Sequence, residues 1–276
     1  MKKVTLSASV EAVCPTGPYQ NQRFAFGISE EIEVSDDKDL REKHEAMGSK
    51  CYDLFKTFEQ RAVEERISLE RKDFRFYKLA TGELVPSVTT FLNYDADFFM
   101  SAELLQEYAS QGNIIDAIGK HFYIKGKHVT DLKELINTYP ELWTDYVIVK
   151  KGTLAFDPTN WNIPAFHEKH PFKMHSVGAK VLNEKDRYGG TMDMDGEYEG
   201  KLTIADFKRT PDKVKNLCQL ACYAKASNKE YKQMMIIPAY PDNQQGFSKP
   251  IISDEIDKFY TIAMTKREGF KKRYGL

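Results

Sequence analysis

Apolar and polar residues alternate near the start of the chain, first from Val4 to Val13 and again from Phe24 to Ile28. The alternation indicates two β-strands, and the proline- and glycine-rich stretch at residues 15–18 predicts the turn between them. From about Asp39 onward, apolar residues recur at the intervals of three or four that mark one helix face. They are Met47, Cys51, Leu54, Phe58 and Ala62. The pattern predicts a β-β-α extension over residues 1–75, whose role no motif indicates.

The next part of the chain, up to about residue 150, is dominated by helical spacing. Ser87 directly precedes the apolar run from Val88 to Leu92, in the place of a helix N-cap. Farther on, Asp131 and Glu134 have the spacing of a capping box, which opens another helix. The middle of the chain is therefore expected to be mostly helical.

Residues 188–210 combine the pattern of a β-hairpin with three charged side chains. Two glycines precede Asp193, a glycine-rich turn follows, and a run of alternating apolar residues ends at Asp206, Phe207 and Lys208. Because side chains two apart on a strand share a face, Asp206 and Lys208 are expected to project together. If the strands pair in register, Asp193 comes close to Asp206, and the two carboxylates can hold one hard divalent cation.

Two carboxylates with a divalent ion suit phosphodiester cleavage, because the ion neutralises phosphate oxygens and acidifies a water molecule. An isolated Asp-x-Lys also fits the turn and strand-end residues of an ordinary solvated hairpin. Asp195 is the nearest competitor for a metal role, but it precedes Gly196 and is interpreted as a turn residue. Downstream, residues 214–226 predict an amphipathic helix on which Gln219 and Tyr223, four residues apart, share a face.

Three of these elements follow each other between residues 189 and 223: a Gly-Gly-Thr-x-Asp strand, an Asp-x-Lys strand and a Gln-x-x-x-Tyr helix. Their order and spacing resemble the PD-(D/E)xK nuclease superfamily, specifically its RecB-like branch. Upstream, residues 84–90 and 108–116 resemble motifs of phage and mitochondrial-genome-maintenance-type exonucleases of this branch. The resemblance implies an α/β fold for residues 76–276, with a restriction-endonuclease-like core in which helices flank a small mixed sheet.

The resemblance also implies a role for each matching residue. Asp193 and Asp206 would bind Mg²⁺ or Mn²⁺ with the backbone carbonyl of Phe207, and Lys208 would assist the attacking water. Asp116 stands where relatives carry a histidine, and an aspartate there can bind the metal directly or through water. The side chains expected to face the nucleic-acid strand, support the site or hold backbone phosphates are Gln219, Tyr223, Arg209, Lys213 and Lys215.

The chain departs from the family pattern at two further points. Relatives often carry a glutamate before the Gly-Gly strand, and Gly178 stands near that position here. The usual Asp-x-Lys-Thr is interrupted by Arg209, which precedes Thr210. The implied site therefore keeps its central carboxylates and lysine, but its metal shell is altered.

The implied activity is metal-dependent DNA hydrolysis by an exonuclease that acts on DNA ends or single strands, in phage-type recombination, replication or repair. Two alternatives stay open. One is a nuclease-fold DNA-binding protein that has lost catalysis, which Asp116 and the missing glutamate favour. The other is a protein recruited through its N-terminal extension to a recombination or replication protein.

Composition narrows the class of protein less than the motifs do. The chain of 276 residues has 41% hydrophobic and 29% charged residues, which argues for a real core and against wholesale disorder. Its 40 Lys and Arg against 41 Asp and Glu give a formal charge of −1, which argues against a histone-like coat of DNA but allows a local basic groove. A basic stretch at residues 266–273 fits a DNA-contacting tail or a solvated helix end equally.

The cysteines and the first residues of the chain indicate the cellular compartment in which the protein is expected. Four scattered cysteines are too few for a disulfide framework, so a reducing environment is expected. The start of the chain lacks the apolar block of a signal peptide, and no apolar run reaches membrane length, so we expect a cytoplasmic protein with no membrane partner. Some relatives hold an iron–sulfur cluster, but Cys218 and Cys222 do not match their cysteine pattern and are expected to be packed in the core without one.

Overall fold

The computed structural model describes residues 2–17, 20–70, 74–95, 101–152, 157, 160–239 and 243–274, with side chains for all of these except 10–26, 56–70 and 102. The chain divides into two compact units. Unit 1 comprises residues 1–85 with residues 271–276, and unit 2 comprises residues 86–270. The sequence pattern placed the boundary after residue 75.

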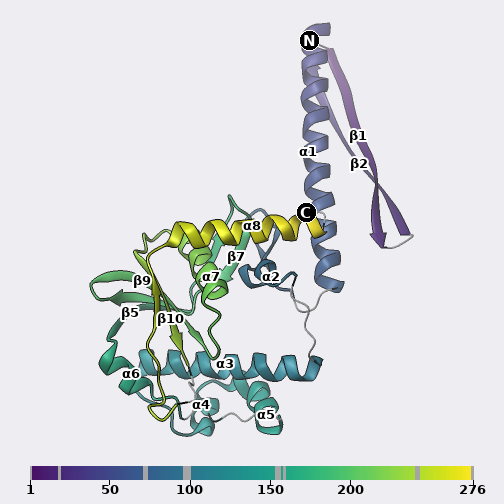
Figure 1. Cartoon of the computed structure of the whole chain (residues 1–276). Coiled ribbons are helices and arrows are strands. Elements are labelled where there is room, and N and C mark those ends of the chain that lie inside the picture. Colours follow the sequence, from purple (N-terminus) through teal and green to yellow (C-terminus); the bar gives the residue numbers. More distant parts are fainter. Residues whose placement is uncertain are drawn as a thin grey trace. The chain divides into compact units, whose positions relative to one another are not determined.

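Unit 1 begins with a long antiparallel hairpin of β1 (Lys2–Gly17) and β2 (Gln20–Val34), and α1 (Asp37–Glu70) follows and packs along β1 (Figure 1). The β-β-α order predicted from the alternating pattern is therefore confirmed, although residues 18 and 19 of the predicted turn lie outside the described residues.

The helix face expected from the spacing is corrected at one position. Met47 and Cys51 are buried as predicted, but Leu54 is exposed and Phe55 is buried in its place. The side chains of Phe58 and Ala62, the last two residues of that predicted face, lie outside the described residues. The buried positions therefore advance by four residues at a time, which keeps them on the side of α1 that contacts the hairpin.

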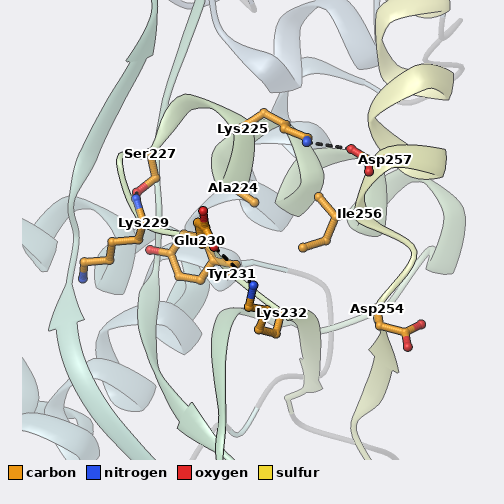
Figure 2. A pocket seen from close by; sticks show the side chains of 10 residues that line it. All are labelled: Ala224, Lys225, Ser227, Lys229, Glu230, Tyr231, Lys232, Asp254, Ile256 and Asp257. Carbon is orange, nitrogen blue, oxygen red and sulfur yellow. Dashed lines mark hydrogen bonds and ion pairs between the residues drawn. The ribbon is translucent and has the colours of Figure 1, made fainter.

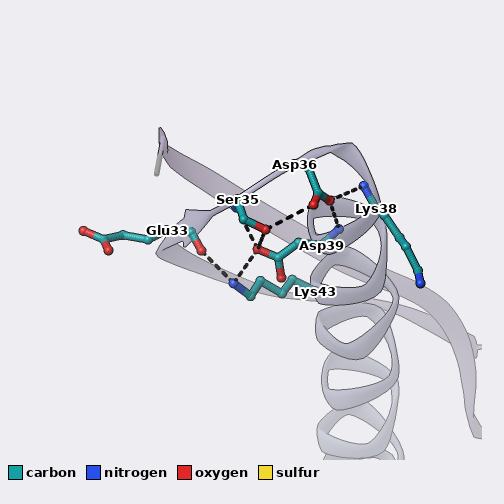
Figure 3. Close-up of polar contacts among 6 residues, drawn as sticks. All are labelled: Glu33, Ser35, Asp36, Lys38, Asp39 and Lys43. Atoms are coloured by element: carbon teal, nitrogen blue, oxygen red, sulfur yellow. Dashed lines mark hydrogen bonds and ion pairs between the residues drawn. The ribbon is translucent and has the colours of Figure 1, made fainter.

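Polar contacts fix the start of α1 directly after the hairpin (Figure 3). Asp36 Oδ1 accepts hydrogen bonds from the backbone N–H groups of Lys38 and Asp39, each at 2.9 Å, and so satisfies donors that the first helical turn leaves open. Lys43 Nζ donates to the Glu33 carbonyl oxygen at 2.6 Å and to Asp39 Oδ2 at 3.0 Å. The end of β2 and the first turns of α1 are thus tied by neighbouring residues.

Unit 2 is built on a five-stranded sheet with the order β11-β10-β9-β8-β5. The strands are β5 (Phe172–Val177), β8 (Met194–Tyr198), β9 (Lys201–Lys208), β10 (Gln233–Pro238) and β11 (Ile251–Ser253). The β9–β10 pair is parallel and the other pairs are antiparallel. A two-stranded sheet in unit 2 is formed by β6 (Lys180–Asn183) with β7 (Tyr188–Thr191), and another is formed by β3 (Phe76–Lys78) of unit 1 with β4 (Leu84–Pro86), of which all but Pro86 belongs to unit 1. The protein therefore has a mixed α/β fold, as the sequence predicted.

Helices lie on both sides of this sheet (Figure 1). They are α2 (Val88–Leu92), α3 (Ala102–Lys125), α4 (Leu132–Thr138), η1 (Pro140–Leu142), α5 (Trp143–Lys151), α6 (Ile163–Lys169), α7 (Lys213–Ala226) and α8 (Ile256–Tyr274).

Ser87 caps α2 as predicted, because its hydroxyl accepts the Thr90 N–H at 3.1 Å, and Asp131 caps α4. The basic stretch near the C-terminus is part of α8, where Arg267 and Phe270 are buried. None of the helices in the described part of the chain is long and apolar enough to cross a membrane.

The core of unit 2 holds α3 against the sheet. Ile114, Ile115 and Ile118 of α3 are buried in one cluster with Phe207 of β9. Gly119 lets the Phe207 ring approach the helix, because a Cβ atom there would lie 2.6 Å from that ring. This close approach sets the rotation of α3 over β9, and with it the direction of the polar side chains one turn away.

Candidate active site

The β8–β9 hairpin brings the first two candidate carboxylates together. Met194 pairs with Ala205, so Asp193, the residue before β8, lies opposite Asp206. The turn is made by Glu199 and Gly200, whose φ angles of 50° and 74° suit a tight two-residue hairpin. The backbone N–H of Phe207 donates to Asp193 Oδ2 at 3.2 Å and anchors that carboxylate at the strand end.

The turn interpretation of Asp195 is wrong, because this residue lies inside β8 and is buried. It accepts hydrogen bonds from Tyr231 Oη at 2.8 Å and Lys229 Nζ at 2.5 Å, and from the Ser176 hydroxyl. Gly196 is needed for close packing and not for a turn, because a Cβ atom there would lie 2.2 Å from the Lys173 carbonyl oxygen. Asp195 is thus a fully bonded structural carboxylate.

Asp206 is 1% exposed and pairs with Lys208, whose Nζ lies 2.5 Å from Asp206 Oδ2. Burial raises the pKa of Asp206 well above its usual range, and the facing Asp193 adds to the rise. Burial would also raise the pKa of Asp193, but its hydrogen bond with Asp206 and the charges of Lys208 and Lys120 lower it. Lys208 behaves in the opposite sense: burial would lower its pKa, but Asp206 and Asp193 raise it. The acid pair therefore favours one shared proton beside a charged ammonium group.

A third carboxylate comes from α3. Asp116 Oδ2 accepts a hydrogen bond from Lys120 Nζ at 2.5 Å, and the same nitrogen lies 3.7 Å from Asp193 Oδ1. Burial, followed by the charge of Asp193, raises the pKa of Asp116 to about 6. Among the described residues, Asp116 Oδ1 is buried without a hydrogen-bond partner. Three carboxylates and two ammonium groups thus form one cluster, called here the acidic cluster: Asp116, Asp193, Asp206, Lys120 and Lys208.

Lys120 is the member that sequence reasoning missed. It follows Asp116 by four residues, the spacing at which helical side chains meet, so the signal was present in the sequence. Its ammonium group lies between Asp116 and Asp193 and supplies part of the positive charge that these carboxylates need.

Of the three expected phosphate-binding residues, Arg209 directly follows Lys208 of the acidic cluster in the sequence. Arg209 donates to the Gln111 side-chain oxygen, and its guanidinium carbon lies 5.7 Å from the centre of the Tyr108 ring. Burial lowers the pKa of Lys215, the charge of Asp212 raises it, and the charge of Lys208 lowers it again. Lys213 is exposed at the start of α7.

Gln219 and Tyr223 lie inside the fold. Both side chains are buried, and Gln219 Nε2 donates to Tyr223 Oη at 3.1 Å. The Tyr223 ring packs so closely on β7 that a Cβ atom at Gly190 would lie 2.2 Å from it. The two residues therefore hold α7 on the Gly-Gly strand, which Ser87 also joins through a parallel bridge to Gly189. Cys218 and Cys222 are buried on the same helix as free thiols.

The acidic cluster matches the expected divalent ion in ligand type but not in arrangement. Within the described ranges, no three or more His, Cys, Asp or Glu side chains are grouped as a metal site, and ammonium groups accompany the carboxylates instead. Hard carboxylate oxygens, one of them buried without a partner, are nevertheless the ligand type that Mg²⁺ and Mn²⁺ prefer. The residue types therefore fit such an ion, although Lys120 and Lys208 contact these carboxylates in this structure.

A pocket of about 510 Å³ lies elsewhere in unit 2, beside the end of α7 and the start of α8 (Figure 2). Its lysines have acidic partners: Lys225 Nζ lies 2.6 Å from Asp257, and Lys232 Nζ lies 3.3 Å from Glu230. Because these cations are already neutralised, the pocket lacks the charge expected of an anion site.

Comparison of the chain with protein-family models and with curated proteins found no match.

Proposed function

We propose that the protein is a metal-dependent DNA nuclease, with a restriction-endonuclease-like core of the PD-(D/E)xK, RecB-like type. The observation that carries the proposal is the acidic cluster, in which Asp193 and Asp206 face each other beside Lys208. Buried carboxylates that repel each other lower the stability of the folded state, and groups of this kind occur most often at functional sites. The resemblance favours an exonuclease that acts on ends or single strands in the cytoplasm.

Each residue of the cluster has a place in this reaction. Asp193, Asp206 and the Phe207 carbonyl would hold Mg²⁺ or Mn²⁺, with Asp116 completing the shell directly or through water. The bound ion supplies charge neutralisation and an acidified water. Lys208, whose ammonium form is favoured by its carboxylate neighbours, orients the attacking water and stabilises negative charge on the phosphate. The attacking water would give up a proton as its oxygen forms a new bond to phosphorus, the bond to the leaving ester oxygen would break, and that oxygen would take up a proton.

The test is cleavage of end-labelled single- and double-stranded DNA in Mg²⁺, Mn²⁺ or EDTA. We expect products with either metal and none in EDTA, and Lys208→Ala or Asp206→Ala should lower the rate by about 10²- to 10³-fold or more. Lys229→Ala is the matched control, because Lys229 also lies 2.5 Å from a buried carboxylate but outside the cluster. Cleavage in EDTA, or cleavage that survives both cluster substitutions, would contradict the proposal.

A second candidate is a nuclease-fold protein that binds DNA without cutting it. The observation in its favour is that Lys120 and Lys208 already neutralise the carboxylates in part. This candidate predicts a shifted DNA band in native gels. In the cleavage assay it predicts no product at any metal concentration.

A further inference from the structure

Helix α5 presents two aromatic rings and a cation on one exposed face. Trp143 is 59% exposed, more than any other large apolar side chain in the described part of the chain. Its ring centre lies 5.9 Å from that of Tyr146, and Lys150 Nζ lies 5.7 Å from the Tyr146 ring centre. Because these residues are spaced by three and four, they share one side of the helix. We call this surface the Trp143 face.

Helix α5, which carries the Trp143 face, is tied to α3. The Asn113 side-chain amide donates to both carboxylate oxygens of Asp145, each at 3.2 Å, and so ties the first turn of α5 to α3. Asn113 lies one helical turn before Asp116, which corresponds to about 4.5 Å along the axis. Helix α5 is therefore held on the same helix that carries Asp116.

A second ring and cation lie on α3 itself. Tyr108 is 42% exposed, and the Arg209 guanidinium carbon lies 5.7 Å from its ring centre. Arg209 directly follows Lys208, the last residue of β9. Flat rings accompanied by cations thus occur on both α5 and α3.

We propose that the Trp143 face binds the unpaired bases of single-stranded DNA and leads that strand past Tyr108 and Arg209 to the acidic cluster. This inference specifies the substrate of the proposed nuclease and rests on that function. Exposed aromatic rings stack on the flat face of any base, whereas the bases of a duplex are already stacked on each other. Lys150 and Arg209 supply the positive charge that a phosphate backbone requires.

The surroundings of Trp143 favour a nucleic acid over an apolar protein partner. Its neighbours Glu141 and Thr144 and the nearby Lys150 are exposed polar residues, so the rings do not belong to a broad apolar patch. A protein interface would bury such a patch, whereas base stacking needs only isolated rings beside cations.

Tryptophan fluorescence gives a direct test, because the chain has two tryptophans and Trp161 is fully buried. The protein is titrated in EDTA with a 12-nucleotide oligothymidylate or with a blunt duplex of the same length. We expect saturable quenching by the single strand and little by the duplex. Trp143→Leu should weaken single-strand binding, measured by the anisotropy of a labelled oligonucleotide, by about 5- to 100-fold, and Trp143→Phe by less.

Ile124→Ala serves as the control, since Ile124 is an exposed apolar residue of α3 that lacks an aromatic ring. Equal quenching by the duplex, or unchanged affinity of Trp143→Leu, would overturn the inference. Because binding is measured in EDTA, its failure is separable from failure of the nuclease proposal. Lys208-dependent cleavage without Trp143-dependent binding would reject only the surface, and the reverse result would reject only the cleavage.

Discussion

Asp195 and Asp206 lie on neighbouring strands, both are buried, and each has a lysine ammonium group 2.5 Å away, yet their surroundings differ. Burial would raise the pKa of Asp195, but hydrogen bonds from Lys229, Ser176 and Tyr231 lower it. For Asp206, burial raises the pKa, and the facing Asp193 raises it further. The first carboxylate is satisfied by its neighbours, whereas the second is held against repulsion. The difference separates a carboxylate that maintains the fold from one kept for chemistry.

The largest expected difference between the two carboxylates concerns stability. Asp195→Ala should lower the free energy of unfolding by about 3 kcal/mol, because the Tyr231 and Ser176 hydroxyls lose their acceptor inside the fold. Asp206→Asn should lower the free energy of unfolding by less, because loss of the ion pair with Lys208 is offset by relief of the repulsion from Asp193. Urea unfolding of both variants without metal makes the measurement. An equal loss in the two variants would remove the distinction.

Divalent ions should sharpen the same comparison. At roughly thirty times the dissociation constant of Mg²⁺, binding to the folded state alone raises the free energy of unfolding by about 2 kcal/mol. This gain should disappear in Asp206→Asn and persist in Asp195→Asn, because only the first carboxylate belongs to the acidic cluster. Thermal unfolding with and without Mg²⁺ checks the prediction, and a gain that survives in Asp206→Asn would place the ion elsewhere.

The smallest expected effect is the pH dependence due to Asp116. Its pKa is about 6 in the folded protein against an ordinary value of 3.8, so folding takes up a proton between these values. The stability contributed by the protonated carboxyl is therefore fully present below pH 3.8 and is lost as the pH rises through about 6. We expect the difference in unfolding free energy between wild type and Asp116→Asn to change by on the order of 1 kcal/mol across this range, because the side chain is 32% exposed. A difference that is flat with pH would contradict the raised pKa.

The hairpin and the position of its two charged groups were readable from the sequence because strand geometry is local. Residues two apart share a face, so the spacing of Asp206 and Lys208 was enough to place their side chains together. The helix caps at Ser87 and Asp131 were readable for the same reason, since the hydroxyl and carboxylate bond to backbone within three residues. The family resemblance stays a prediction.

What the sequence could not provide depends on contacts between distant segments. Asp195 followed by glycine has the pattern of a turn, but the glycine is needed because β5 passes close to it through the Lys173 carbonyl. The inward direction of Lys120 depends on how α3 is rotated, which the contact of Gly119 with the Phe207 ring decides. Neither effect is present in local spacing, because both arise from packing of one element on another.

The acidic cluster joins α3 to the β8–β9 hairpin, so its carboxylates come from parts of the chain that are far apart in sequence. Contacts of this kind form late in folding, because a long loop must close before they are made. The repulsion among the carboxylates is therefore absent while the hairpin and the helices first assemble, and it arises when α3 docks on the sheet. We therefore expect this repulsion to raise the unfolding rate far more than it lowers the folding rate. The protein can then hold these carboxylates together without slowing its own folding.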